Sequence, residues 1–426
     1  MPSQAIYLDH NATAPMLPEV ADAVREASLR YAGNPASQHD AGRRSRRALE
    51  TARRRIGEIL GARASGMDAD LVIFTSGGTE SNNLALGGLL PDVYAEQAPT
   101  AYPGQPLMEY PGQPRPSLVG ASGGVDVRSR LIISALEHPS VTRTAERLAQ
   151  RGVHLERLGV DQHGVVRVDL LLELLSATSP PPQERGTLVS VMLASNETGV
   201  LQPVVDIAPL CRQLGVLLHT DASQVVGKLP VDFRQLGVDA LTATAHKFHG
   251  PLGIGLLVVR HGTRLRPALF GGFQQGGARP GTESVALAVG MQTALELWQQ
   301  EAAERRQRMT ELRDRLEAKI VSGYPAAVVI GRDAPRLPHT SNIAFVGLDR
   351  QAFAMALDLA GVASSTGSAC ASGSSEPSPA LVAMGLPDAV VSSSLRFSLG
   401  AATTVVDVDE AVSRILSVAN RLRREK

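Results

Sequence analysis

Short runs of apolar residues recur along the first two thirds of the chain, and such runs are typical of buried β-strands. The clearest of them cover residues 71–74, 131–134, 188–193, 216–219 and 254–259. Longer segments with helical periodicity lie between several of these runs. The alternation predicts an α/β fold with a mostly parallel sheet covered by helices on both faces. Ligands of such sheets bind at the carboxyl ends of the strands.

The pattern changes after about residue 299. A long charged helix is predicted over residues 301–319, followed by shorter strands and helices of α+β character. A chain of 426 residues is also long for a single core. We therefore predict a large domain over residues 15–295 and a small domain that combines residues 1–14 with residues 296–426.

Residues 91–128 interrupt the pattern with a composition rich in proline and glycine. The pentapeptide Tyr-Pro-Gly-Gln-Pro occurs there twice, at 102–106 and at 110–114. Such a segment buries too little apolar surface to order itself, so we predict a mobile loop inserted between a helix and a strand. A docking site for a proline-binding partner is the alternative.

Composition excludes several classes of partner. Lysine and arginine together number 42, as do aspartate and glutamate, so no global field attracts nucleic acid or an anionic membrane. Two cysteines far apart in sequence, Cys211 and Cys370, are typical of a reducing compartment. The N-terminus lacks a secretory signal, and no apolar run approaches the roughly 18 residues of a transmembrane helix. These features predict a soluble, cytoplasmic protein.

Lys247 has the surroundings of a reactive amine. It lies among small, polar and glycine residues in Thr-Ala-Thr-Ala-His-Lys-Phe-His-Gly-Pro-Leu-Gly at 242–253, just ahead of a predicted strand. A lysine held at a strand end away from bulk water can lose its proton and bind pyridoxal phosphate as a Schiff base. A surface lysine in a glycine-containing loop is the alternative.

Two further candidates each follow a predicted strand. Gly78 and Thr79 belong to a glycine-rich turn into a helix, where backbone N–H groups and the threonine hydroxyl can donate to a phosphate. His138, in a Glu-His-Pro sequence, could stack on an aromatic ring or move protons. A structural role would explain this histidine equally.

Three polar residues follow the next strands along the chain. Asn196 could orient a substrate carboxylate or the cofactor's phenolic oxygen, or simply form a turn. Asp221 could pair with a pyridinium nitrogen and keep it protonated, or cap the next helix. Gln224 could donate to the phenolate oxygen of the same ring.

Along the chain these candidates follow the order phosphate turn, histidine, asparagine, aspartate with glutamine, and lysine. This order resembles that of the class V, fold-type I pyridoxal phosphate enzymes, and within them the cysteine desulfurases of the NifS/IscS type. The resemblance covers nearly the whole chain apart from residues 91–128, and it includes Tyr-Leu-Asp-His-Asn-Ala-Thr at 7–13 and Gly-Asn-Pro-Ala-Ser at 33–37. It implies a large domain with a mostly parallel seven-stranded sheet, a smaller α+β domain, and a homodimer.

The resemblance also implies a role for each candidate. Lys247 would hold the cofactor, His138 would stack on its ring, and Asp221 would contact the ring nitrogen. Asn196 and Gln224 would complete the ring contacts. The phosphate would be bound by Gly78, Thr79, Thr244 and His246, and Thr282 would reach the phosphate of the neighbouring subunit. No metal is implied.

Cys370 narrows the choice among the many reactions that use pyridoxal phosphate. The small, polar residues of 364–377 predict an exposed flexible loop, and a thiolate on such a loop can attack a substrate sulfur and carry it away. An unreactive free thiol is the alternative. Cys211 lies in a predicted apolar-faced helix over 207–214 and is expected to be a buried packing residue. Arg396 matches the family's substrate-carboxylate motif, with a surface salt bridge as the alternative.

We therefore predict a homodimeric cysteine desulfurase that converts L-cysteine to L-alanine with His138 as the candidate acid. Sulfur would pass to Cys370 as a persulfide, then to an acceptor protein, either an iron–sulfur cluster scaffold or a tRNA-thiolation protein. The length of the segment 365–377 resembles that of the long-loop group, which delivers sulfur to proteins. Alternatives are a selenocysteine lyase, another class V reaction, or a non-catalytic sulfur-transfer scaffold.

Overall fold

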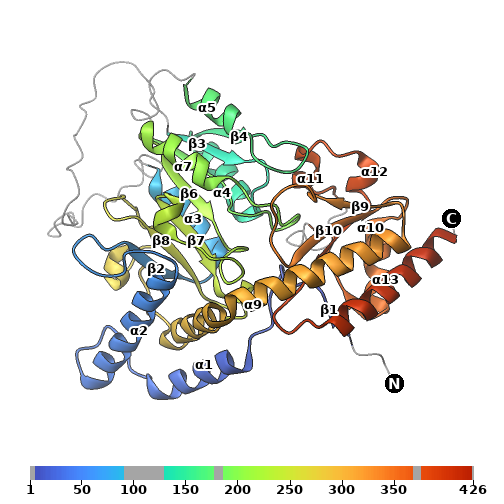
Figure 1. Ribbon diagram of the computed structural model, residues 1–426. Helices are drawn as coiled ribbons and strands as arrows, with labels where there is room; N and C mark the ends of the chain where they lie inside the picture. Colours follow the sequence, from blue (N-terminus) through green and yellow to red (C-terminus); the bar gives the residue numbers. More distant parts are fainter. Residues whose placement is uncertain (1–4, 91–128, 177–185, 368–375, 425–426) are drawn as a thin grey trace.

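A computed structural model describes residues 5–90, 129–176, 186–367 and 376–424 (Figure 1). The segment 91–128 and Cys370 lie outside the described residues. Within these four ranges, no helix combines the length and the apolar character needed to cross a membrane.

A seven-stranded sheet forms the centre of the larger part of the molecule. Its strand order is β2 (Leu71–Thr75), β8 (Gly255–Val259), β7 (Ala240–Thr244), β6 (Leu217–Asp221), β5 (Thr187–Ser190), β3 (Arg130–Ser134) and β4 (His154–Leu158). The strands from β7 to β4 are parallel, while β8 runs antiparallel to both of its neighbours. The predicted fold class is therefore confirmed.

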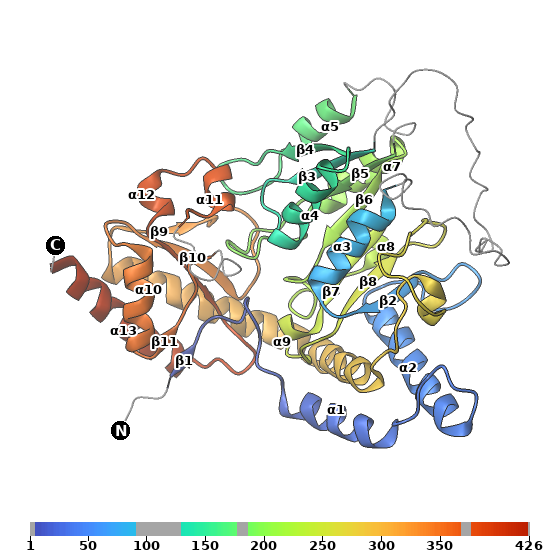
Figure 2. The same ribbon diagram turned by 180° about the vertical axis from the view of Figure 1, so that it is seen from behind.

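Helices cover both faces of this sheet, which explains why several of its strands are continuous apolar runs. Leu131 and Ile133 of β3 pack in one core cluster with residues of α3 (Gly78–Leu89) and α4 (Pro139–Ala149). Ile132, between them, belongs to the cluster on the opposite face, which includes α7 (Val204–Gln213). The alternation along β3 thus divides its side chains between two layers of helix (Figures 1 and 2).

One long helix, α9 (Val285–Gly323), runs through both parts of the molecule (Figure 1). Met291 and Leu295 pack in the core of the large sheet, whereas Leu312 and Leu316 pack in a separate C-terminal core. The helix predicted over 301–319 is therefore the second half of a longer one. Its first half is apolar and buried, and for that reason the change of composition near residue 299 does not mark its start.

The C-terminal core is built on the antiparallel sheet β12 (Ser394–Ser398), β10 (Thr340–Phe345), β9 (Ala327–Ile330). Helices α10 (Arg350–Leu359) and α13 (Val405–Arg424) pack beside it. The N-terminal strand β1 (Ile6–Tyr7) pairs with β11 (Val362–Ala363), so residues 8–14 return from this part toward the large sheet (Figure 2).

The remaining elements are α1 (Pro18–Arg30), α2 (Asp40–Ile59), α5 (Val168–Ser176), α8 (Phe233–Leu236), α11 (Pro379–Ala383), α12 (Asp388–Val391) and the 3-10 turns η2 (Ala245–Lys247) and η3 (Gln274–Gly277).

Candidate active site

The candidate residues lie at the carboxyl ends of the strands of the large sheet. Asp221 is the last residue of β6, and Thr244 is the last residue of β7. Lys247 lies in η2, directly after β7. Gly78 begins α3 after β2, and His138 precedes α4 after β3. The topology therefore brings residues that are remote in the sequence to one edge of the sheet.

The start of α3 is open to an anion. Its N-cap residue, Gly77, provides no side-chain cap, so the first N–H groups of the helix keep their hydrogen-bonding capacity. A Cβ atom on Gly78 would lie 3.3 Å from Ser223 Oγ and 3.5 Å from Thr244 Cγ2. Glycine thus allows the helix to begin close to Thr244, and the N–H groups and this threonine face the same space.

A hydrogen-bonded chain joins Asp221 to His138. Asn82 Nδ2 donates to Asp221 Oδ2 at 2.7 Å and to Ser140 Oγ at 2.8 Å. The Ser140 hydroxyl lies 2.8 Å from His138 Nδ1, and the Ser223 N–H donates to Asp221 Oδ1 at 2.9 Å. Asp221 is only 8% exposed, so these donors stabilise its buried charge.

The same contacts fix the tautomer of His138. The Ser140 N–H also donates to Nδ1, at 3.1 Å, which requires a lone pair on that atom and places the ring proton on Nε2. Burial lowers the pKa of His138, and the positive charges of Lys247 and Arg396 lower it further, against the opposing effect of Asp221. The imidazole is therefore neutral at neutral pH and holds its proton at Nε2.

Lys247 is held by the backbone of the N-terminal segment. Its Nζ donates to the carbonyl oxygens of Asn11 at 2.6 Å and of Ala12 at 2.7 Å. Gln224 Nε2 donates to the same Asn11 oxygen at 3.1 Å. Asn11 therefore brings together two residues that follow different strands of the large sheet.

Arg396 is a buried guanidinium, 1% exposed, on β12 of the C-terminal sheet. Its Nη2 donates to Asp9 Oδ1 at 2.7 Å and its Nη1 donates to the backbone oxygen of Asn196 at 2.9 Å. Its Nε is buried and has no partner among the described residues. The Nε donor thus remains for a further acceptor beside Asn196.

Other predicted residues have different surroundings. His246 Nδ1 lies 3.2 Å from Thr13 Oγ1, and Thr282 is exposed in the turn before α9. Cys211 is 1% exposed in α7, and burial raises the pKa of its thiol to about 12, which confirms it as a packing residue. Cys370 falls in the range 368–375, outside the part of the chain described.

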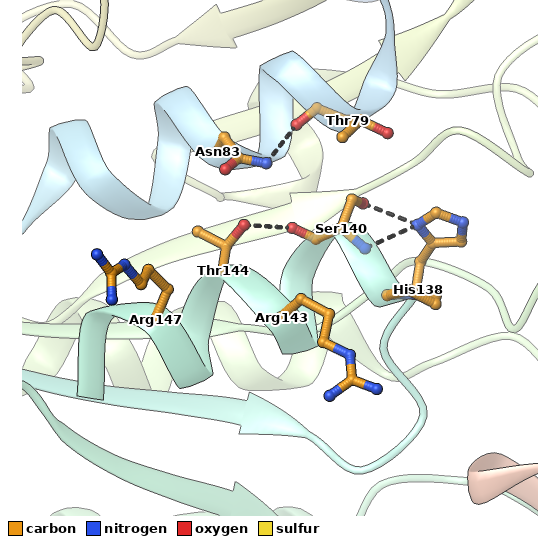
Figure 3. Close-up of a pocket in the computed structure, with 8 residues that line it drawn as sticks. Thr79, Asn83, His138, Ser140, Arg143, Thr144 and Arg147 are labelled. Atoms are coloured by element: carbon orange, nitrogen blue, oxygen red, sulfur yellow. Dashed lines mark hydrogen bonds between the residues drawn. The ribbon is translucent and has the colours of Figure 1, made fainter. Parts of the chain in front are cut away.

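A cavity of about 420 Å³ opens beside His138, between α3 and α4 (Figure 3). Thr79 and Asn83 line it from α3, and Arg143 and Arg147 line it from α4. Thr79 and His138 thus line the same cavity.

Four residues of this network were not predicted as site residues: Asp9, Asn11, Asn82 and Ser140. Asp9 and Asn11 belong to the motif at 7–13, and Asn82 follows the predicted phosphate turn. Buried asparagines within motifs of this kind are a usable signal, because a buried amide needs several partners. Ser140 has no comparable signal in the sequence.

Another feature near Lys247 is a group of buried basic side chains, made of three histidines and Lys228. His10, His249 and His339 are 7%, 9% and 0% exposed, and the rings of His10 and His249 are 5.8 Å apart. Lys228 is 7% exposed, and its Nζ has no partner in the described ranges. Burial, followed by the charge of Lys247, lowers the pKa of Lys228 to about 7.

Most of the chain matches one known protein family and its members. The family described as aminotransferase class V matches residues 6–98 and 119–411. The unmatched residues 99–118 lie inside the proline- and glycine-rich segment. A cysteine desulfurase of Klebsiella pneumoniae is 37% identical over 421 residues, covering 98% of this chain and 94% of that protein.

Two further relatives agree with this match. Cysteine desulfurase NifS of Azotobacter vinelandii is 35% identical over 418 residues, covering 98% of this chain and 93% of that protein. The X-ray structure of a NifS-like protein from Rickettsia africae has a TM-score of 0.80 at 28% identity, covering 98% of this chain and all of that one.

Replacing Asn82 with alanine should destabilise the protein by about 1–3 kcal/mol, because Asp221 Oδ2 and Ser140 Oγ each lose a buried donor. The measurement is urea denaturation at neutral pH. Asn83→Ala is the matched control, since within the described ranges this exposed neighbour donates to the Thr79 oxygen alone, and its loss should cost no more than about 0.5 kcal/mol. Equal effects for the two variants would contradict the network.

Stability should fall as the pH drops from about 6.5 to 4.5. Burial lowers the pKa of six histidines, namely His10, His138, His219, His246, His249 and His339. It raises the pKa of three carboxyl groups, namely Glu137, Glu197 and Asp239. Below the ordinary histidine pKa the unfolded chain binds more protons than the folded one, so acid favours unfolding despite the opposing carboxyls.

His10→Asn tests this account at one site. Burial, with the neighbouring His249, lowers the pKa of His10 to about 3. Removal of this histidine should therefore reduce the slope of the free energy of unfolding against pH by up to about 1.4 kcal/mol per pH unit, which corresponds to one proton. The exposed His261→Asn should leave the slope unchanged. Stability that stays constant or rises from pH 6.5 to 4.5 would refute the prediction.

Proposed function

The chain belongs to the class V aminotransferases, a family of pyridoxal phosphate enzymes, as a homologue of the cysteine desulfurases, and we propose that it converts L-cysteine to L-alanine. Sulfur would be retained on Cys370 as a persulfide. The observation that carries the proposal is a lysine and a buried carboxylate at one edge of the large sheet, joined by a buried arginine that reaches the same edge from the C-terminal sheet through its bond to the Asn196 oxygen. Lys247, Asp221 and Arg396 are these three residues.

The residues at this edge fit pyridoxal phosphate. The uncapped start of α3, with Gly78, Thr79 and Thr244, suits its phosphate. Asp221 suits the ring nitrogen, because a buried carboxylate favours the protonated pyridinium. Gln224 has a buried Oε1 without a partner in the described ranges, which could accept from a protonated phenolic group, whereas the donor Nε2 is bonded to the Asn11 carbonyl oxygen.

Bound there, pyridoxal phosphate would supply an electron sink for removal of the α-proton and for cleavage of the carbon–sulfur bond. Lys247 would hold the cofactor through its amine, which the carbonyls of Asn11 and Ala12 orient. His246 would add a contact to the phosphate. The hydrogen bond from Asn82 holds the Asp221 carboxyl group in place.

His138 suits the role of proton donor. Its Nδ1 is occupied by Ser140, so the exchangeable proton sits on Nε2. To act as an acid the ring must first become an imidazolium, which requires a proton on Nδ1 in place of the Ser140 N–H contact; the lowered pKa makes that imidazolium a strong acid. We propose that it protonates the leaving or returning groups.

Arg396 would bind the carboxylate of L-cysteine. Its Nε has no partner within the described part of the chain, and a carboxylate that also competes with Asp9 for Nη2 would be bound in two places. Asn196 lies beside it and would orient the same group through its side chain. This arrangement selects amino acids by their shared carboxylate, so the choice of cysteine depends on the thiol chemistry.

Cys370 would perform the sulfur step. Its thiolate attacks the sulfur of bound cysteine, and the new sulfur–sulfur bond forms as the carbon–sulfur bond breaks. The electron pair of the broken bond remains on the carbon side, where a proton completes alanine. The length of the segment 365–377 favours a protein as the next acceptor, either an iron–sulfur cluster scaffold or a tRNA-thiolation protein.

We also propose a cytoplasmic homodimer. Thr282 is exposed, and the same loop exposes Phe270 at 78% and Phe273 at 62%. Exposed aromatic side chains of this size favour burial against a second subunit, which would bring Thr282 to the neighbouring phosphate.

Cys370→Ser should abolish persulfide formation and alanine release, because serine lacks the soft nucleophile that attacks sulfur. Cys211→Ser should keep both activities and lose roughly 1 kcal/mol of stability through a hydroxyl placed in the core. One assay of alanine and protein-bound sulfane sulfur, run on both variants beside the unchanged protein, measures this. Normal turnover by Cys370→Ser with an inactive Cys211→Ser would reverse the assignment.

A further inference from the structure

Glu197 is a buried carboxyl group that none of the proposed chemical steps uses. It is 7% exposed and lies in the turn after β5, next to Asn196 in the sequence. The Ser195 hydroxyl accepts from the Glu197 N–H at 3.2 Å, and Asn342 Nδ2 donates to the Glu197 backbone oxygen at 3.3 Å. The backbone of this residue is therefore fixed from both sides.

Its side chain contacts the C-terminal part of the chain just after the segment 368–375. Ser378 Oγ donates to Glu197 Oε2 at 2.6 Å. The same Ser378 oxygen accepts from the Leu381 N–H at 3.2 Å and caps α11. One hydroxyl thus connects Glu197 to the first helix after the segment that carries Cys370.

The other end of that segment meets the same carboxyl oxygen. A Cβ atom on Gly367 would lie 2.8 Å from Glu197 Oε2, and Gly367 has a φ of +93°, so glycine is required there on both counts. Two residues earlier, Ser365 exchanges backbone hydrogen bonds with Arg396 at 3.1 and 2.7 Å. The start of the segment is therefore anchored to the strand that carries the proposed substrate arginine.

The charges around Glu197 are consistent with a structural contact. Burial raises its pKa, while the bond from Ser378 and the positive charges of Arg396 and Arg350 act in the opposite direction. Arg350 also donates to the backbone oxygen of Glu376, so it helps to fix the same end of the segment. A group of this kind fits a role in holding two backbone ends in place.

We propose that Glu197 is a positioning residue that ties both ends of the Cys370 segment to the substrate-binding residues Asn196 and Arg396. The inference rests on the proposed function. Glu197, Gly367 and Ser378 form what we call the clamp. It fixes the two described ends, Gly367 and Ser378, of the segment to which Cys370 belongs, while binding of the substrate carboxylate depends on Arg396 itself.

The test uses the full-length, cofactor-loaded protein and L-cysteine. Glu197→Ala and Gly367→Ala should each lower kcat for alanine release at least tenfold and change KM less than threefold. Glu197→Gln should keep at least a third of the original kcat, because its amide oxygen can still accept from Ser378. Glu317→Gln is the matched control, a buried carboxyl of α9 paired with Arg336, and should keep kcat within twofold.

Amide hydrogen exchange, measured on the same proteins without substrate, gives a readout that does not depend on turnover. Exchange in the peptides around Ser365–Gly367 and Ser378–Leu381 should quicken at least fivefold in the two alanine variants and stay unchanged in Glu317→Gln. Clamp variants that match Glu317→Gln in both assays would overturn the inference. An unchanged protein that releases no alanine would instead overturn the proposed function, and the exchange result would still decide the clamp.

Discussion

A carboxylate buried at the end of β6 requires compensation, and much of the candidate site provides it. Asp221 is bonded by the Asn82 amide and the Ser223 backbone, and Asn82 extends the contact to Ser140 and so to His138. Each of these residues lies in the first turns after a strand of one sheet. The parallel topology therefore determines both where the charge is placed and which groups can stabilise it.

The site also needs residues from the second hydrophobic core. Arg396 reaches it from β12, and the N-terminal segment carries Asn11 between β1 and α1 to the backbone contact with Lys247. Helix α9 packs in both cores and so fixes their relative position. The groups proposed to bind the substrate and the cofactor thus come from different sheets.

Much of this arrangement could be predicted from the sequence. The apolar runs identified β2, β3, β5, β6 and β8 because both faces of those strands are buried. β4 and β7 were missed, since β4 is a polar edge strand and β7 consists of small residues and threonine. The contacts of Asn82 with Asp221 and of Glu197 with Ser378 each join residues more than 100 positions apart in the sequence, so no local pattern encodes them.

The central claim is that Lys247 is the amine that holds the cofactor. The sequence contains four lysines, Lys228, Lys247, Lys319 and Lys426, so the claim can be tested directly. The measurement is borohydride reduction of the protein saturated with pyridoxal phosphate, followed by peptide mapping of the pyridoxyl label. The account predicts label on Lys247 alone. Label on Lys228, which is 7% exposed, with Lys247 unmodified would contradict it.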